Sequence, residues 1–409
     1  MKHQWLLCLP MGLFLASICG AEFQVNTHTA NDQKSAGIAM GRGGGFVVVW
    51  SSYLQDGSSN GVFAQRFDPN CSPLGEELQI NTTTVGNQTE PAVAMDAAAG
   101  FIVAWQGPGL IDANEDIFLQ RFDPNGSPLG DEFCAGYAAD AQICPSVAVN
   151  ADGSFALVWE SVNLPQAGDR SICARLYDSN GVELGEELLI SEPGAVCRYP
   201  DIAADPNGNF AVAWMEDRSS NSVVARLFNA DGSARGDAFE VSTIPFSSLT
   251  KPSIAMDDAG FFVVAWDGDP KLAGQDDIHA RLFDPNGTPL GEQFIVNTAL
   301  DGAQQYPQAA MSGGGEFVIV WESRTTGADD SQARDIFAQR FDNLGQPVGG
   351  EFRVNTFVQG EQRNAAVGIG DDGHFVAVWQ SDGQDGSRFG IFGEIGPNPD
   401  PADLNEDEP

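Results

Sequence analysis

The segment F-V-V-V-W, residues 46–50, returns along the chain as a short apolar run that ends in tryptophan. F-I-V-A-W (101–105) is the second copy, and five more copies follow. The runs end at Trp50, Trp105, Trp159, Trp214, Trp266, Trp321 and Trp379, at intervals of 52 to 58 residues. A fixed period of this length indicates one supersecondary unit that is used seven times.

Each unit has the pattern of four short strands. In the second unit, apolar runs at 91–95, 101–106 and 116–123 are separated by a turn and a polar loop, and a fourth strand begins near Asp131. Such runs, rich in β-branched and aromatic residues and bounded by Gly, Pro, Asn and Asp, are typical of strands. No window of helical length has apolar residues at helical spacing. Four antiparallel strands in about 50 residues match one blade of a β-propeller.

Alternation within the tryptophan run predicts burial on both faces of the blade. Successive side chains of a strand point to opposite faces, so Phe46, Val48 and Trp50 share one face, and Val47 and Val49 share the other. Both sets are apolar, as expected for a blade that packs between two neighbours. The tryptophans are therefore predicted to be buried packing residues and not ligand platforms.

The two ends of the repeat region supply complementary pieces of one unit. The last unit has three predicted strands between residues 364 and 395 and no fourth. The segment E-F-Q-V-N-T (22–27) matches the fourth strand E-F-R-V-N-T (351–356). The sequence therefore predicts an all-β fold, a single seven-bladed β-propeller over residues 21–396. Its N-terminal strand would complete the last blade, which removes open sheet edges.

The segments outside the repeats are predicted to be a signal peptide and a disordered tail. Residues 1–20 carry Lys2 and His3 before an apolar run and small residues, as in a secretory signal peptide. The protein would thus be secreted or exposed on the cell surface. Residues 397–409 are acidic and rich in proline, without a strand pattern, and are expected to be disordered.

The charge of the chain restricts its partners. The formal net charge is −37, which disfavours nucleic acid and anionic membranes, because both need clustered Lys and Arg. No segment after the signal peptide is apolar enough to insert into a membrane. An extracellular protein or a carbohydrate is the expected partner, and the protein is expected to be a monomer.

Five cysteines follow the predicted signal peptide, and exported proteins can form disulfides. The pairs Cys134–Cys144 and Cys173–Cys197 are favoured, with Cys71 left unpaired. The alternative, in which all five are small core residues, has equal support, because spacing alone does not determine connectivity.

Comparison of the units separates constant turns from variable loops. The turns D-x-x-G-x-F and D-P-N-G are nearly constant, and their Asp and Gly are expected to cap the turn and supply positive φ. The loops between second and third strands vary and should surround the channel mouth, the default binding surface. Their aspartates are the candidate ligand-binding residues: Asp56, Asp112, Asp169, Asp217, Asp269, Asp329 and Asp382. The alternative is that these loops are acidic only for solubility.

Calcium is the one cofactor that the acidic loops suggest, and the fold requires none. Hard oxygen ligands suit calcium, although the EF-hand spacing is absent. The candidate metal ligands lie in two loop segments: Asp276, Asp277, Asp329 and Asp330.

Catalytic motifs are absent from the sequence. The four histidines form neither H-x-H nor H-E-x-x-H, and no strand-to-helix elbow of the G-x-S-x-G type is predicted. The main hypothesis is therefore a binding module that recognises protein or glycan through the variable-loop face. The alternative is a polysaccharide-active hydrolase or lyase that uses loop carboxylates, since a glycosidase needs only Asp and Glu.

The repeat also resembles one found in secreted and surface bacterial proteins, including RTX-type and adhesin-like chains. The resemblance is carried by G-G-F-V-V-V-W (44–50), G-V-F-A-Q-R-F-D (61–68), D-I-F-A-Q-R-F-D (335–342) and G-E-F-R-V-N-T (350–356). It covers about residues 22–396 and implies a secreted or surface repeat protein. It carries over no catalytic residue.

Overall fold

The computed structural model describes residues 22–109, 114–136, 140–164, 168–217, 221–244, 246, 250–269, 276–300, 302–324 and 334–396. These residues form 28 β-strands and no helix. Accordingly, none of them belongs to a helix that is long and apolar enough to cross a membrane. The predicted signal peptide and acidic tail lie outside the described residues.

The strands of the described chain pair into five sheets of four strands and one sheet of eight. The first sheet contains β2 (Gln33–Met40), β3 (Phe46–Tyr53), β4 (Asn60–Phe67) and β5 (Leu78–Gln79). The second contains β6 (Thr89–Met95), β7 (Phe101–Pro108), β8 (Glu115–Phe122) and β9 (Phe133–Gly136). The eight-stranded sheet contains β10 (Gln142–Val149), β11 (Phe155–Leu164), β12 (Gly168–Tyr177), β13 (Leu188–Leu189), β14 (Val196–Ala204), β15 (Phe210–Asp217), β16 (Asn221–Phe228) and β17 (Phe239–Glu240). The fourth sheet contains β18 (Ser253–Met256), β19 (Phe262–Gly268), β20 (Asp277–Phe283) and β21 (Phe294–Ile295). The fifth contains β22 (Gln304–Met311), β23 (Phe317–Ser323), β24 (Asp335–Phe341) and β25 (Pro347–Arg353). The last sheet contains β26 (Gln362–Ile369), β27 (Phe375–Asp382) and β28 (Phe389–Ile395), together with β1 (Phe23–Gln24).

The eight-stranded sheet consists of two antiparallel four-stranded segments, β10–β13 and β14–β17. One parallel pair, Arg170↔Val196, joins β12 of the first segment to β14 of the second. Each segment therefore has the same strand order as the separate sheets.

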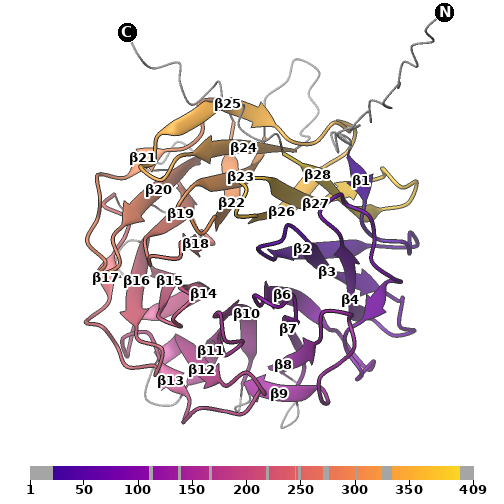
Figure 1. Cartoon of the computed structure of the whole chain (residues 1–409), viewed down its shortest axis with the longest axis horizontal. Helices are drawn as coiled ribbons and strands as arrows, with labels where there is room; N and C mark the ends of the chain where they lie inside the picture. The colour runs from indigo at the N-terminus through magenta and orange to yellow at the C-terminus, as the bar shows by residue number, and fades with distance from the viewer. Residues whose placement is uncertain are drawn as a thin grey trace, which may run out of the picture.

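The sheets surround a central axis, with the first strand of each repeat innermost (Figure 1). Each innermost strand contacts those of the two neighbouring sheets, and β26 contacts β2, which closes the ring. The innermost strands are β2, β6, β10, β14, β18, β22 and β26. This radial arrangement is that of a β-propeller.

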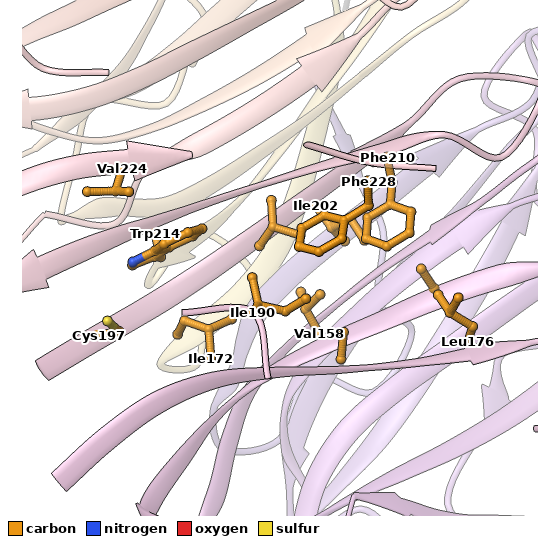
Figure 2. Close-up of a cluster of buried hydrophobic side chains, with 13 residues drawn as sticks. Val158, Ile172, Leu176, Ile190, Cys197, Ile202, Phe210, Trp214, Val224 and Phe228 are labelled. Carbon is orange, nitrogen blue, oxygen red and sulfur yellow. The ribbon is translucent and has the colours of Figure 1, made fainter. Parts of the chain in front are cut away.

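The hydrophobic cores lie between neighbouring sheets. Phe46, Val48 and Trp50 pack against the sheet of β26–β28, whereas Val47 and Val49 pack against β7 and β8. Figure 2 shows the corresponding core between the two segments of the eight-stranded sheet. All seven repeat tryptophans are at most 1% exposed, which confirms the prediction that they are buried packing residues.

Four of the buried indole N–H groups donate to a glutamine that lies 17 residues earlier in the chain. The bonds are Trp105 to Gln88 (3.1 Å), Trp159 to Gln142 (2.8 Å), Trp321 to Gln304 (3.1 Å) and Trp379 to Gln362 (3.0 Å). Since a buried donor without a partner is costly, these four bonds offset the cost of burying the indole N–H at those positions.

The N-terminal strand completes the last sheet, as predicted. β1 pairs with β28, and the side-chain oxygen of Asn26 accepts a 2.6 Å hydrogen bond from the N–H of Ile391. Asn355 accepts the equivalent bond from Ile336 inside the repeat region, at 2.7 Å. Glu22 in turn accepts a 2.8 Å bond from the N–H of Thr356, which links the closing strand to the preceding sheet.

The constant turns have the predicted structural role. In the turn between β8 and β9, Asp123 Oδ1 accepts the N–H groups of Asn125 and Ser127, both at 2.8 Å. Gly126 between them has a φ of 83°, which glycine adopts without steric cost. Asp and Gly in this turn therefore maintain its geometry.

The predicted disulfides Cys134–Cys144 and Cys173–Cys197 are not formed among the described residues. Cys134 lies on the outermost strand β9, and Cys144 lies on the innermost strand β10. Cys173 and Cys197 are buried in cores on opposite faces of the β10–β13 segment. Proximity in sequence does not bring these thiols together, and Cys173 and Cys197 are small core residues instead.

Ring closure makes a testable prediction about two matched asparagines. Asn26→Ala should destabilise the protein as much as Asn355→Ala, because each change removes the acceptor of a buried backbone N–H. The expected loss is about 1–3 kcal/mol for each variant, measured by chemical denaturation with tryptophan fluorescence. If Asn355→Ala is destabilising and Asn26→Ala is neutral, the N-terminal segment does not close the ring.

Candidate functional site

A β-bulge interrupts the innermost strand of six repeats at the same place. In β2, the register shift between Lys34 and Gly37 leaves Ser35 and Ala36 together opposite Trp50 of β3. The same shift occurs in β6, β10, β14, β22 and β26, each time opposite the repeat tryptophan. The first residue of each bulge has a positive φ, between 49° and 56°: Ser35, Glu90, Cys144, Tyr199, Tyr306 and Asn364.

These bulge residues and Lys251, which occupies the equivalent position before β18, line one cavity of about 560 Å³ at the channel. We call the seven residues the channel ring. A non-glycine residue in the left-handed region costs about 1–2 kcal/mol, and strain of this kind is concentrated at functional sites. The backbone is nearly constant around the ring while the side chains differ, so the ring is the candidate functional site.

The channel ring lies near the start of the innermost strands. The second strand of each repeat runs antiparallel to the first, so it ends beside the start of the first strand. The variable loops follow the second strands and therefore lie on the same face as the ring. The channel ring therefore lies on the face of the variable loops, but the first strands and not the loops provide the side chains of the cavity.

Side chains from the preceding repeat hold the bulges in place. The residue after the tryptophan accepts the backbone N–H of the next ring residue at four positions: Gln106 from Cys144 (3.1 Å), Glu160 from Tyr199 (3.2 Å), Glu322 from Asn364 (2.7 Å) and Gln380 from Ser35 (3.2 Å). Asp267 accepts the N–H of Tyr306 in the same way. The ring geometry thus depends on contacts between neighbouring sheets.

A carboxylate and a lysine from repeats that are not neighbours meet across the channel, and a tyrosine lies beside the lysine. Glu90 Oε1 accepts a 3.3 Å hydrogen bond from the Ser35 hydroxyl, and its Oε2 lies 3.9 Å from Lys251 Nζ. The ammonium of Lys251 also lies 5.4 Å from the ring centroid of Tyr199. Burial disfavours the charged ammonium, but Glu90 and other acidic groups outweigh this effect and raise the pKa of Lys251. Lys251 is therefore a stable cation at the cavity wall.

Two residues further along the innermost strands, Asp201 links three neighbouring repeats. Its Oδ1 accepts the Ser146 hydroxyl at 2.7 Å, and its Oδ2 accepts the Ser253 hydroxyl at 3.2 Å and the Ile254 N–H at 2.9 Å. Oδ1 also accepts the N–H of Ile202 at 3.0 Å. Burial raises the pKa of Asp201, although these donors oppose the shift. This carboxyl group lines the same cavity as the ring.

The loop aspartates that the sequence singled out do not gather at this cavity. Asp56 accepts hydrogen bonds from Ser58 (3.0 Å) and Asn81 (3.2 Å) and so stabilises its own loop. The other described members are Asp169 and Asp217, which are exposed, Asp269, which is buried, and Asp382, which is half-buried at the end of β27. None of the described members lines the cavity, because the second and third strands lie farther from the axis. Asp112 and Asp329 lie outside the described residues.

The candidate calcium ligands have other partners. Asp276 Oδ2 accepts a 2.8 Å bond from Gln305, and Asp277 Oδ1 accepts a 2.8 Å bond from Asn297. Within the described ranges, no group of three or more His, Cys, Asp or Glu is arranged to hold a metal ion. Asp329 and Asp330 lie outside those ranges, and calcium binding stays a prediction.

A sequence signal for the channel ring exists, although the loop comparison missed it. Each ring residue lies fifteen residues before its repeat tryptophan and directly before Pro or Ala. Within an otherwise similar strand, this position holds Ser, Glu, Cys, Tyr, Lys, Tyr and Asn in turn. Variation at one position of a constant strand could have indicated the site.

Similarity to known proteins concerns the fold alone. No protein-family model and no curated protein sequence matches this chain. A protein of unknown function from Dyadobacter fermentans has a similar fold, with 10% identity, a TM-score of 0.53, and coverage of 91% of this chain and 97% of that chain. The NanB sialidase of Streptococcus pneumoniae is 10% identical, with a TM-score of 0.50 and coverage of 93% and 70%. The α-L-arabinanase of Penicillium chrysogenum is 13% identical, with a TM-score of 0.49 and coverage of 75% and 92%.

The strain at the ring makes a prediction about Tyr306, which has a φ of 56°. Tyr306→Gly should be more stable than Tyr306→Ala by about 1 kcal/mol, because only glycine adopts positive φ without steric cost. Thermal unfolding of the two variants measures the difference. If the alanine variant is the more stable, as at an ordinary strand position, the bulge stores no strain.

A second prediction concerns Asp267, which anchors Tyr306. Burial, with a contribution from Asp276, raises the pKa of Asp267 to about 7 despite a hydrogen bond from Thr250. The folded pKa lies above the unfolded value of about 4, so the stabilisation is complete below pH 4 and is lost as pH rises towards 7. The free energy of unfolding should therefore fall more steeply over this range in the wild type than in Asp267→Asn. Parallel pH profiles for the two proteins would contradict the assignment.

Proposed function

We propose that this protein acts on a polysaccharide at the channel ring, as a glycan hydrolase or lyase. The observation that carries the proposal is the cavity of about 560 Å³, in which equivalent backbone positions present different chemical groups. This volume falls in the range of sites for small ligands and suits a short stretch of a glycan. Tyr199 and Tyr306 offer aromatic faces to sugar rings, and Glu90 and Asp201 offer carboxyl groups.

The two carboxyl groups lie in different environments, as an acid and a base require. Burial raises the pKa of Asp201 and so favours a form that can donate a proton. Glu90 lies 3.9 Å from the ammonium of Lys251, and in this proposal its carboxylate accepts a proton or attacks carbon. Two carboxyl groups in different environments can perform acid–base chemistry at glycosidic bonds. In this proposal Asp201 is the acid and Glu90 is the base or nucleophile.

The class of fold is compatible with this chemistry. A β-propeller of similar shape is a sialidase, although that similarity extends only to the fold. Export of the protein, inferred from residues 1–20, would expose the ring to extracellular polysaccharides, and a monomer suffices because one chain supplies every ring residue.

Glycan binding without turnover is the second candidate. Asp201 accepts four hydrogen bonds from the protein itself. This arrangement also suits a carboxylate whose only role is to hold three neighbouring repeats together. The module would then recognise a glycan through the tyrosines, Glu90 and Lys251. This version moves the binding surface of the original hypothesis from the loops to the ring.

A polysaccharide screen with two readouts distinguishes these functions. New reducing ends together with ultraviolet absorbance of an unsaturated product indicate a lyase, and reducing ends alone indicate a hydrolase. Glu90→Gln and Asp201→Asn should each reduce turnover by about 100-fold or more, whereas Asp56→Asn, in a loop outside the cavity, should not. Binding without products would select the second candidate. Cleavage that neither Glu90→Gln nor Asp201→Asn reduces would refute the proposal. Absence of binding to any glycan would refute it as well.

We also infer that the ring has seven blades. The support is the closed circuit of contacts among the innermost strands and the single residue pair that joins the two segments of the eight-stranded sheet. An experimental structure would test this count directly.

A further inference from the structure

Cationic side chains gather around Tyr199 on one side of the channel ring. The parallel pair Arg170↔Val196 brings Arg170 beside β14, and Arg198 follows two residues after Val196. Lys251 Nζ lies 5.4 Å from the Tyr199 ring centroid on the other side. Arg170, Arg198, Tyr199 and Lys251 thus belong to three neighbouring repeats and form what we call the Tyr199 subsite.

Lys251 differs from the arginines that the repeat uses for packing. Arg226 and Arg281 occupy equivalent positions on third strands and donate to backbone carbonyls of Ile190 (3.0 Å) and Val241 (3.1 Å) in the preceding repeat. Such arginines join neighbouring sheets in a way that the repeat reproduces. By contrast, Lys251 is the only cation among the seven channel-ring residues, so packing of the repeat does not account for it.

The acidic groups in contact with the Tyr199 subsite are partly committed to other bonds. Arg170 pairs with Glu160, whose other oxygen accepts the N–H of Tyr199, and Lys251 pairs with Glu90. Burial, and repulsion by the positive charge of Arg198, lower the pKa of Arg170, which the strand register places beside β14. An anion placed between them would relieve this repulsion.

An anionic ligand would need such a local cluster in this protein. The chain has 57 acidic and 20 basic residues, and its overall field repels polyanions at long range. Recognition of an anion therefore depends on cations at the site itself. Arginine suits this task because its planar guanidinium matches carboxylate and sulfate oxygens.

We propose that the Tyr199 subsite binds an acidic sugar residue, with its carboxylate or sulfate facing Arg170, Arg198 and Lys251 and its ring against Tyr199. The inference rests on the proposed function and specifies the substrate class as acidic polysaccharide. Carboxylate and sulfate share the required chemistry, and the experiment separates them.

Matched polysaccharides test this inference by isothermal titration calorimetry. One pair is polygalacturonate and its methyl ester, and the other is dextran sulfate and dextran. We expect the charged member of at least one pair to bind at least tenfold more tightly, with an affinity that falls as salt is added. The pair that shows the difference identifies the carboxylate or the sulfate as the recognised group.

Variants then locate the binding site. Lys251→Met and Arg198→Gln should each weaken binding of the charged polysaccharide by about tenfold or more, a loss of roughly 1.4 kcal/mol. Arg235→Gln, which alters an exposed arginine beside the turn between β16 and β17, is the matched control and should bind normally. Thermal unfolding of each variant verifies that the fold is retained.

The outcomes separate the inference from the proposed function. Equal binding of charged and neutral glycans would overturn the inference and leave the proposed function intact. Binding of a charged glycan that neither Lys251→Met nor Arg198→Gln weakens would have the same consequence. No binding or cleavage of any glycan would overturn both.

Discussion

The bulge opposite six of the seven repeat tryptophans is the constraint on which the fold and the site both depend. The indole fills the core between two sheets, and at the same level the first strand carries an extra residue in the left-handed region. This residue faces the channel because the bulge alters the direction of the strand locally. The element that packs one sheet on the next therefore also places a side chain in the cavity.

Contacts between sheets make this arrangement cooperative. The residue that follows a tryptophan accepts the N–H of the next ring residue in five repeats, and the closing strand supplies the last link through Asn26 and Glu22. A closed ring keeps these contacts in register all the way round. The closed ring can therefore hold several residues with strained backbone conformations at one level. The side chain at each of these positions can differ between repeats, because the backbone fixes where it lies.

Sequence alone could predict the burial of the tryptophans and the closing strand, because repetition makes both visible within one chain. Variation fifteen residues before each tryptophan could have indicated the channel ring, but not the bulge that forms it, because a bulge depends on register between strands, which local sequence does not determine. Asp56 was expected at the binding surface but stabilises its own loop instead. Cys173 and Cys197 were paired because they are close in sequence, yet a whole sheet segment separates their cores.

Native-state hydrogen exchange at Val25 tests the closed ring most directly. The N–H of Val25 donates to Ile391 at 2.8 Å, as those of Val296 and Val354 donate to Ile278 (2.8 Å) and Ile336 (2.7 Å) inside the repeat region. If the N-terminal strand is an integral part of the ring, all three amides should exchange with similar free energies of opening. Exchange at Val25 that is orders of magnitude faster than at Val296 and Val354 would show that the strand detaches by itself, and the ring would then not be closed.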